Sequence, residues 1–311
     1  MILLWGICGD DPMDCVRVAL ERRGAPYLFL DQQAVGETAL DLVVDGSEDG
    51  PQGQLRTRDW TAGLHEITSV YLRPYDTRQM LTVRDTPEDS AERRHAAALD
   101  DALLTWLELT PALVLNRPGA MASNTSKPYQ AMLMAAAGTA VPDTLVTTVE
   151  EAVRSFADRH GEVVYKSASG VRSIVSRLSA RRDAELGDVA GCPTQFQEFV
   201  DGADLRVHVV GEHAFATEVI AVGDDYRYSD AQPRAVELDD AELKQCLALS
   251  RALDLPLAGI DLRRTPDGAS VFFEVNPSPG FTYYQAATGQ PIAEAIASLL
   301  AEPGFGQGRF R

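Results

Sequence analysis

The feature that most constrains the fold is an apolar hairpin near the carboxyl terminus that carries two acids in its interior. Residues 258–276 read AGIDLRRTPDGASVFFEVN, which is two apolar runs joined by the turn sequence Thr-Pro-Asp-Gly. Side chains alternate between the two faces of a strand, so Asp261 and Arg263 share a face, and Glu274 and Asn276 share a face. A carboxylate and an amide inside an apolar strand call for a reason other than packing.

The length of the turn decides whether Asp261 and Glu274 lie on the same side of the hairpin. A two-residue loop places them directly opposite each other, and a four-residue loop, Thr265 to Gly268, places them diagonally on one side. A three-residue loop would separate them. Because Pro266 lacks the N–H that closes a two-residue loop, we expect the four-residue form.

Carboxylates that converge without a counter-ion are costly, since opposed like charges destabilise a sheet and desolvated acids recruit a cation. The all-oxygen set of Asp261, Glu274 and Asn276 suits Mg²⁺, with Mn²⁺ as the alternative ion. The competing interpretation is that Arg263, on the face of Asp261, neutralises Glu274 in an ion pair.

Charge and cysteine content exclude several classes of protein. The chain has 311 residues and a formal net charge of −18, which is the wrong sign for a phosphate-backbone footprint, so we expect no nucleic-acid partner. Four cysteines without a CxxC spacing predict reduced thiols in a cytoplasmic protein. No apolar run approaches 18 residues, and we therefore expect no association with a membrane.

The pattern of strands and helices changes along the chain. Strands expected near 2–8, 26–30, 40–44, 69–74 and 112–116 are interspersed with helical patterns, which predicts an N-terminal parallel α/β domain over 1–116. Short runs spaced like an antiparallel sheet follow from about 163. We predict a small subdomain over 117–200 and a C-terminal subdomain over 201–311 that holds the metal site.

A magnesium ion held in this way indicates a nucleotide, so phosphate partners are expected. Lys127 lies where a helix begins and Lys166 ends an apolar run, although either lysine by itself reads as a surface residue. Phe199 belongs to an apolar stretch that could wall an adenine or simply pack in a core. Arg227 could contact a phosphate or lie in a surface loop. No GxxxxGK[ST] or GxGxxG motif occurs.

These motifs resemble those of the ATP-grasp superfamily, in particular the glutathione synthetase and RimK-like carboxylate–amine ligases. The similarity runs from NRPGAMASNTSKPYQ to PIAEAIASLL, and its most specific part is AGIDLRR with FFEVNPSPGF. The resemblance implies a pre-ATP-grasp α/β domain followed by a two-subdomain ATP-grasp fold. The roles that it implies are ATP-phosphate contacts by Lys127, Lys166 and Arg227, an adenine site at Glu198 and Phe199, ribose binding by Asp204, Mg²⁺ binding by Asp261, Glu274 and Asn276, and a place for Arg206 near the transferred phosphate and the acceptor carboxylate.

The expected activity is an ATP-dependent ligation of a carboxylate to an amine through an acyl phosphate, on an amino acid or a peptide, with Arg206 and Arg227 as catalytic residues. Arg73 is a further candidate for binding a substrate carboxylate. The sequence VYLRPYD is similar to that of graspetide (microviridin-type) ligases, which crosslink ribosomal peptides, but NPSPGFTYY is closer to the RimK-like form. An ATP-grasp kinase, a silent nucleotide-binding scaffold and a homodimeric assembly are left open.

Overall fold

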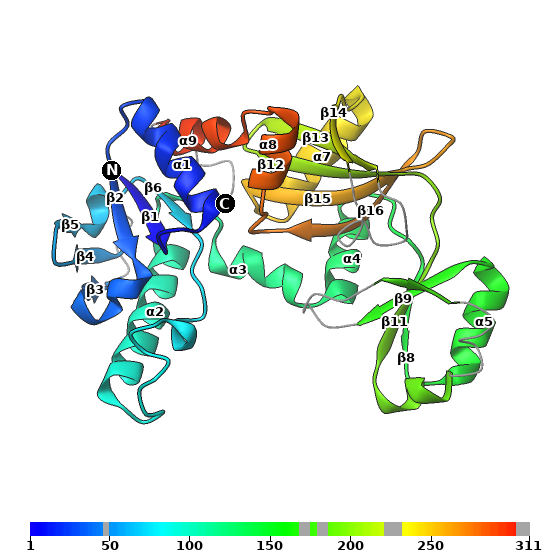
Figure 1. The fold of residues 1–311 in the computed structure, drawn as a ribbon, viewed down its shortest axis with the longest axis horizontal. Helices are drawn as coiled ribbons and strands as arrows, with labels where there is room; N and C mark the ends of the chain where they lie inside the picture. The colour runs from blue at the N-terminus through cyan, green and yellow to red at the C-terminus, as the bar shows by residue number, and fades with distance from the viewer. Residues whose placement is uncertain (46–49, 168–174, 179–185, 221–231, 303–311) are drawn as a thin grey trace.

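The computed structural model describes residues 1–45, 50–167, 175–178, 186–220 and 232–302. Four β-sheets in these residues form three units (Figure 1). An N-terminal α/β unit lies at one end of the long axis, a five-stranded sheet follows it, and a smaller four-stranded sheet lies at the other end. The mixed α/β architecture with a parallel N-terminal sheet confirms the expected fold class.

The N-terminal unit is built on a parallel sheet of strand order β2-β1-β6-β7. Alternate residues of β1 point to opposite faces: Leu4 packs with α1 and α9, whereas Leu3 packs with α2. The bounds are β1 (Ile2–Gly6), β2 (Tyr27–Asp31), β6 (Ser69–Leu72), β7 (Leu113–Leu115), α1 (Asp11–Arg22) and α2 (Ala91–Leu109). Both faces of the sheet are therefore covered, as a parallel sheet requires.

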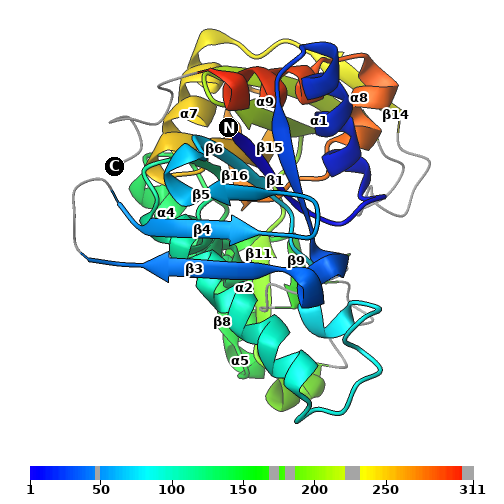
Figure 2. The same cartoon turned by 90° about the vertical axis from the view of Figure 1, so that its left-hand side faces the viewer.

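The expected strand at 40–44 forms, but it belongs to a separate antiparallel sheet. This sheet has the order β3-β4-β5, with β3 (Ala39–Val43), β4 (Gln52–Arg56) and β5 (Thr61–Gly63) (Figure 2). Val43 is exposed while Leu40 and Leu42 pack against the core, so only one face is buried, which an antiparallel sheet tolerates and a covered parallel sheet does not. Short 3₁₀ helices, η1 (Gln32–Glu37), η2 (Leu64–Glu66) and η3 (Thr77–Gln79), complete the unit.

The four-stranded sheet, of order β10-β9-β11-β8, is antiparallel. Its core is a small cluster in which Phe196 packs with Val153 and Phe156 of α5. The bounds are β8 (Thr144–Thr147), α5 (Glu150–His160), β9 (Val163–Ser167), β10 (Ser176–Arg177), η5 (Leu186–Gly191) and β11 (Thr194–Glu198).

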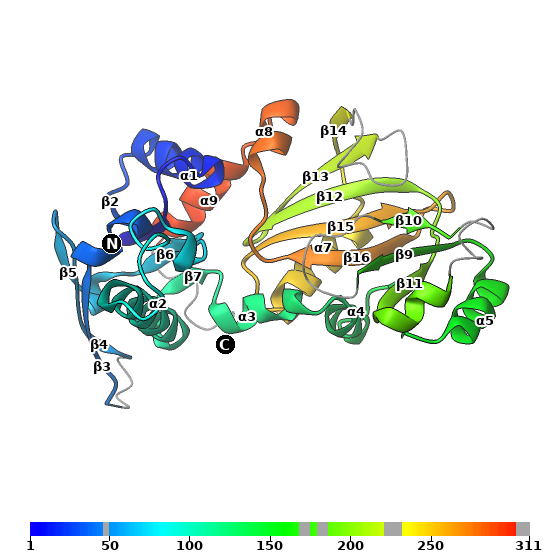
Figure 3. The same ribbon diagram turned by 60° about the horizontal axis from the view of Figure 1, so that its bottom comes forward.

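The five-stranded sheet has the order β14-β13-β12-β15-β16 and is antiparallel throughout (Figure 3). Its core joins the sheet to α4 and α7. The bounds are β12 (Ala203–Val210), β13 (His213–Ile220), β14 (Gln232–Val236), α7 (Asp240–Ala252), β15 (Leu257–Arg264) and β16 (Ser270–Asn276), preceded by α3 (Pro118–Met121), η4 (Ala122–Thr125) and α4 (Lys127–Ala136). His208 and His213 lie on either side of the turn of the β12–β13 hairpin.

The chain returns to the N-terminal unit at its end. After α8 (Thr282–Thr288), helix α9 (Ile292–Ala301) packs against α1, and the same core takes in Val210, Leu257 and Phe281 from the C-terminal half (Figure 1). The N-terminal unit and the five-stranded sheet thus share one apolar core. Within the described residues no helix is both long enough and apolar enough to span a membrane.

Candidate active site

The two interior acids face each other across the hairpin that ends the five-stranded sheet. Asp261 of β15 is the register partner of Glu274 of β16, and Gly259 is the partner of Asn276. Directly opposed residues on antiparallel strands point to the same face, and Asn276 lies two residues from Glu274 on that face. The predicted convergence of Asp261, Glu274 and Asn276 on one face is the arrangement that the structure has.

The turn that joins these strands differs from the expected four-residue loop. The amide N of Thr265 donates to the carbonyl O of Ala269 (2.8 Å), so the loop has three residues, and Gly268 adopts a φ of 86°. A positive φ at this position is typical of three-residue loops, and glycine adopts it without strain.

A three-residue loop by itself would have placed the two acids on opposite faces. A β-bulge compensates for it: Leu262 pairs with Phe272 while Asp261 pairs with Glu274, which leaves Phe273 as the extra residue. Leu262 and Phe272 are both buried in the core behind the sheet. The bulge therefore satisfies the core on one face and keeps both acids on the other.

The neighbouring strand adds an arginine to this face. Arg206 of β12 is the register partner of Asp261, and its Nε lies 2.9 Å from Asp261 Oδ1. Its Nη1 donates to the carbonyl O of Gly259 (3.2 Å), and its guanidinium lies 5.8 Å from the ring centroid of Tyr284. The structure thus brings the predicted catalytic arginine and a predicted metal ligand into contact.

The alternative in which Arg263 neutralises Glu274 is wrong. Arg263 instead pairs with Asp204, its register partner on β12, with 2.6 Å between Nη2 and Oδ1. Arg263 Nη1 also donates to the carbonyl O of Val200 (2.5 Å). The carboxylate of Asp204, the predicted ribose ligand, is therefore already paired with the Arg263 guanidinium.

The donor set on this face fits a hard divalent cation. Two carboxylates and one amide supply only oxygen ligands, which suits Mg²⁺ completed by water and phosphate oxygens. The side-chain Oδ1 of Asn276 accepts a hydrogen bond from the amide N of Ser278 (2.9 Å), which fixes the orientation of the amide. The described part of the chain holds no cluster of three or more His, Cys, Asp or Glu side chains that could bind a metal, so this set depends on its amide.

The buried residue His208 lies next to Arg206 on the same face of β12. His208 follows Arg206 by two residues on β12, is fully buried, and lies 5.1 Å from Tyr284 between ring centroids. Burial, and next the positive charge of Arg206, lower the pKa of His208 to about 3. The ring is therefore neutral at physiological pH and lends no charge to the site.

The predicted phosphate and adenine residues lie on other elements. Lys127 is the first residue of α4, as expected, and the hydroxyl of Ser126 caps that helix. Lys166 lies in β9 opposite Gln195. Arg227 and most of the small-residue segment after Lys166 lie outside the described residues.

The residues predicted to line the adenine site lie at the end of β11: Glu198 is its last residue and Phe199 follows it. The amide N of Glu198 donates to Asp143 O (3.1 Å), and the amide N of Phe199 donates to Glu162 O (2.9 Å). Guanidinium groups from both sheets approach the ring of Phe199: Arg177 at 4.0 Å and Arg263 at 5.5 Å from its centroid. Phe199 therefore lies at the junction of the two sheets.

Arg73 connects the N-terminal unit to the segment that follows β16. Its Nε lies 2.6 Å from Asp10 Oδ2, and its Nη1 donates to Ser278 Oγ (3.0 Å). Burial by itself would raise the pKa of Asp10, but hydrogen bonds from Arg73, Tyr75 and the Met13 amide, with the charge of Arg73, lower it. Arg73 is thus already compensated by an acid.

Asp10 also caps helix α1. The Asp10 carboxylate accepts a hydrogen bond from the Met13 amide N (3.1 Å), and α1 begins at Asp11. Asp10 takes this place because Arg73 and Tyr75 hold its carboxylate at the start of the helix.

Sequence reasoning missed two buried amides near the predicted metal ligands: Gln130 binds the backbone of Val275 in β16, and Asn116 binds the backbone of Leu257 in β15 and of Pro277, the residue after β16. Both are 1% exposed. The available signal was an amide at a position that otherwise reads as buried, Gln130 one turn into α4 and Asn116 at the end of an apolar strand.

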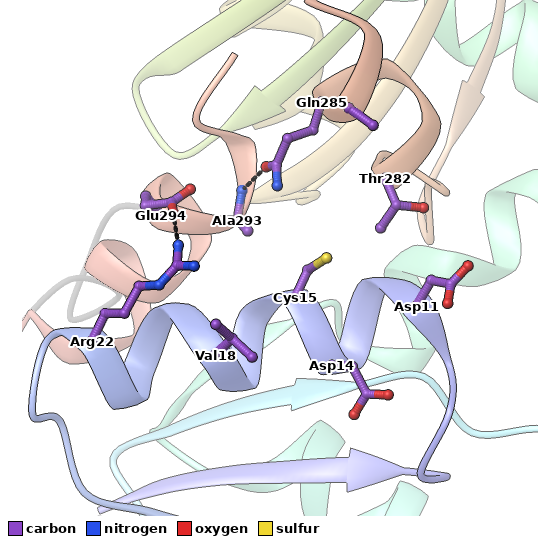
Figure 4. A pocket seen from close by; sticks show the side chains of 10 residues that line it. Asp11, Asp14, Cys15, Val18, Arg22, Thr282, Gln285, Ala293 and Glu294 are labelled. Carbon is purple, nitrogen blue, oxygen red and sulfur yellow. Dashed lines mark hydrogen bonds and ion pairs between the residues drawn. The ribbon is translucent and has the colours of Figure 1, made fainter. Parts of the chain in front are cut away.

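A separate cavity of about 420 Å³ lies between α1, α8 and α9 (Figure 4). Arg22 and Glu294 form an ion pair across its rim (3.4 Å), and Gln285 accepts a hydrogen bond from the Ala293 amide (2.8 Å). None of the predicted nucleotide or metal residues lines it, so we do not assign the ligation site there.

The fold, the hairpin face and the two sheets around Phe199 are those of an ATP-grasp protein. The model of the RimK-like ATP-grasp domain matches residues 124–300, more than half of the chain, and the chain belongs to this family. The expected resemblance is confirmed.

Curated relatives match over the same region. A probable alpha-L-glutamate ligase of Pasteurella multocida (strain Pm70) is 28% identical over 205 residues, which is 62% of this chain and 65% of that protein. A probable alpha-L-glutamate ligase of Aliivibrio salmonicida (strain LFI1238) is 27% identical over 213 residues, 64% of this chain and 70% of that protein. The chain therefore spans roughly two thirds of the length of these relatives.

Solved structures are similar over nearly the whole chain. The ATP-grasp ligase PsnB, complexed with minimal precursor, has a TM-score of 0.77 at 26% identity and covers 96% of this chain and 98% of its own. PsnB with a phosphomimetic precursor variant, Mg and ADP has a TM-score of 0.76 at 25% identity, with coverages of 96% and 97%. The macrocyclase MdnC from Microcystis aeruginosa MRC, bound with precursor peptide MdnA, shares the fold, with a TM-score of 0.77 at 23% identity and coverages of 97% and 100%.

Proposed function

We propose that the protein is an ATP-dependent carboxylate–amine ligase that activates a carboxylate as an acyl phosphate. The observation that carries this proposal is the register of β15 and β16, which sets Asp261, Glu274 and Asn276 on one face beside Arg206. Oxygen ligands next to a fixed guanidinium are the groups that a magnesium-bound triphosphate requires.

Each predicted residue has a role in this proposal. Mg²⁺, or Mn²⁺ in its place, would be held by Asp261, Glu274 and Asn276 and would supply charge neutralisation at the phosphates. Arg206 would stabilise charge on the transferred phosphoryl group, since its planar fork can reach two oxygens at once. The remaining ATP contacts that we propose are Lys127, Lys166 and Arg227 to the phosphates, Glu198 and Phe199 to the adenine, and Asp204 to the ribose.

The reaction proceeds in two steps. A carboxylate oxygen of the substrate attacks the γ-phosphorus of ATP, and the bond from that phosphorus to the bridging oxygen breaks to release ADP. The amine nitrogen then attacks the acyl carbon, the carbon–oxygen bond to phosphate breaks, and inorganic phosphate leaves. The proton lost by the amine passes to a phosphate oxygen, since we assign no protein base. The protein contributes positioning and charge compensation.

A peptide is the substrate class that we favour over a free amino acid. The ligases PsnB and MdnC, which are seen with precursor peptides, are similar to this chain over its N-terminal unit as well as its ATP-grasp part. In this chain Arg73, from the VYLRPYD segment, contacts Ser278, the second residue after β16. A macrocyclase that joins side chains of one ribosomal peptide is therefore the second candidate.

We place the reaction in the cytoplasm, which the four free cysteines support.

The test is a product analysis with purified protein, ATP and Mg²⁺. A panel of amino-acid pairs and of short peptides, including any encoded beside its gene, is screened for release of ADP and phosphate. Loss of one water per bond from a single peptide identifies the macrocyclase. AMP among the products would reject the acyl phosphate, a stable phosphorylated product would indicate a kinase, and nucleotide binding without turnover on any substrate would favour a scaffold.

A further inference from the structure

An amide side chain binds the outer edge of β16 (Ser270–Asn276), which carries the proposed ligands Glu274 and Asn276 and is called the metal strand from here on. β16 is the terminal strand of its sheet, and within the described residues no further strand lies along its outer edge. The backbone of Ala140 bridges that edge at Val271, and the Phe272 amide N donates to the Ala140 carbonyl O (2.8 Å). Nearer the end of the strand, Gln130 of α4 binds the backbone of Val275. Its Nε2 donates to the Val275 carbonyl O (2.7 Å), and its Oε1 accepts from the Val275 amide N (2.9 Å). Val275 stands between Glu274 and Asn276, the two predicted metal ligands of this strand.

A second amide binds the other side of Asn276. Asn116, which follows β7, donates from Nδ2 to the Pro277 carbonyl O (2.5 Å) and to the Leu257 carbonyl O (2.6 Å). Its Oδ1 accepts from the Leu257 amide N (3.1 Å). The residues before and after Asn276 are therefore each bound by an amide that is 1% exposed.

We infer that Gln130 and Asn116 are positioning residues that fix the backbone around Asn276 and so orient Glu274 and Asn276 toward the cation, an inference that rests on the proposed function. Beyond the bridge to Ala140, the end of β16 without these amides would be held by β15 alone and would keep backbone freedom that metal binding would have to remove. Outer groups that hold the ligands in advance avoid that loss.

Gln130 also links the metal strand to the predicted phosphate site. Lys127 lies three residues before Gln130, so the two residues share one side of the first turn of α4. The same helix that presents Lys127 thus holds Val275. A shift of α4 would displace the lysine and the strand together.

The chain contains a matched control for this clamp. Gln32, 2% exposed in the N-terminal unit, donates from Nε2 to the Tyr75 carbonyl O (2.7 Å) and accepts from the Tyr75 amide N (2.9 Å). It makes the same pair of backbone bonds as Gln130 but does not touch the metal strand. Gln130→Met and Gln32→Met therefore remove the same pair of backbone bonds at different places. Each also removes one bond to a side-chain oxygen, from Gln130 to Asn124 Oδ1 (3.5 Å) and from Gln32 to Thr77 Oγ1 (2.8 Å).

The experiment measures Mn²⁺ binding to the full chain in the presence of ADP, by electron paramagnetic resonance of the free ion, together with the melting temperature. We expect both variants to melt at lower temperature, and only Gln130→Met to bind Mn²⁺ about 10–100-fold more weakly. Unchanged Mn²⁺ affinity in Gln130→Met, or an equal loss in Gln32→Met, would overturn the inference.

A milder variant protects the test against misfolding. Gln130→Asn keeps the amide but is one methylene shorter, so it cannot keep both bonds to Val275. If Gln130→Met does not fold, weaker Mn²⁺ binding by Gln130→Asn supports the inference and wild-type affinity overturns it. Failure of the wild-type protein to bind Mn²⁺ with ADP would instead reject the proposed function, and the inference with it.

Discussion

Arg206 and Asp261 stand directly opposite each other on β12 and β15, with 2.9 Å between Nε and Oδ1. The next pair on the same face of these strands, Asp204 and Arg263, has its charges reversed. The four groups compensate one another on the face where Glu274 also lies.

Glu274→Gln removes one negative charge and keeps the size of the side chain. We expect the Mg²⁺ concentration for half-maximal ADP release to rise about 10–100-fold, because a neutral oxygen binds a hard cation more weakly. Thermal unfolding should be nearly unchanged. The exposed Glu88, changed to Gln, serves as the control, and wild-type metal dependence in Glu274→Gln would exclude this residue as a ligand.

Arg206→Lys keeps the positive charge but loses the planar fork that reaches Asp261 and the Gly259 carbonyl together. We expect turnover to fall about 10²–10³-fold, the range seen when a group that stabilises transition-state charge is lost. ADP release at saturating ATP is the measurement. A rate within about twofold of the wild type would show that any cation suffices at this position.

Gly259→Ala should disturb the site through shape alone. A Cβ at this position would lie 2.8 Å from Arg206 Nη1 and 2.7 Å from Pro279 Cβ, so the arginine and the segment after β16 must move. We expect a loss of about 1–3 kcal/mol in the free energy of unfolding, together with reduced ADP release. Gly280→Ala, where an added Cβ meets nothing within 4 Å, should unfold like the wild type; equal behaviour of the two variants would contradict the prediction.

His208 makes stability depend on pH. Its pKa is about 3 in the fold against 6.5 as a model value, so between these pH values the unfolded chain binds one more proton and stability falls as the pH falls. His208→Phe, which keeps an aromatic ring beside Tyr284, should remove this dependence. From pH 6.5 to 5.0 the wild type should lose about 2 kcal/mol more than the variant in urea unfolding; parallel curves would show that the ring does not titrate in this way.

Asp204→Asn tests the predicted ribose contact against its observed partner, Arg263. If the carboxylate binds ATP, the KM for ATP should rise about tenfold, by analogy with the loss of one charge-assisted hydrogen bond, while the KM for the other substrate stays unchanged. Unfolding by urea reports the separate cost of weakening the pair with Arg263. A stability loss without any change in the KM for ATP would restrict Asp204 to a structural role.

Particular residues show how far local patterns reach. The alternation of Glu274 and Asn276, the helix start at Lys127, and the glycine of the turn at Gly268 follow from period and turn chemistry, and the structure has all three. The loop length did not follow, because the buried pair Leu262 and Phe272 and the bulge at Phe273 are set by packing against a core that is distant in sequence.

The sequence by itself determined the class of fold, the family, and the donor types available to a cation, because these depend on side-chain identity and on the periodicity of neighbouring residues. Only the tertiary structure decided which charges meet. The register of β12 against β15 joins Arg206 to Asp261, and Gln130 reaches Val275 across 145 positions. Such contacts depend on how separate elements pack in three dimensions, which no local pattern specifies.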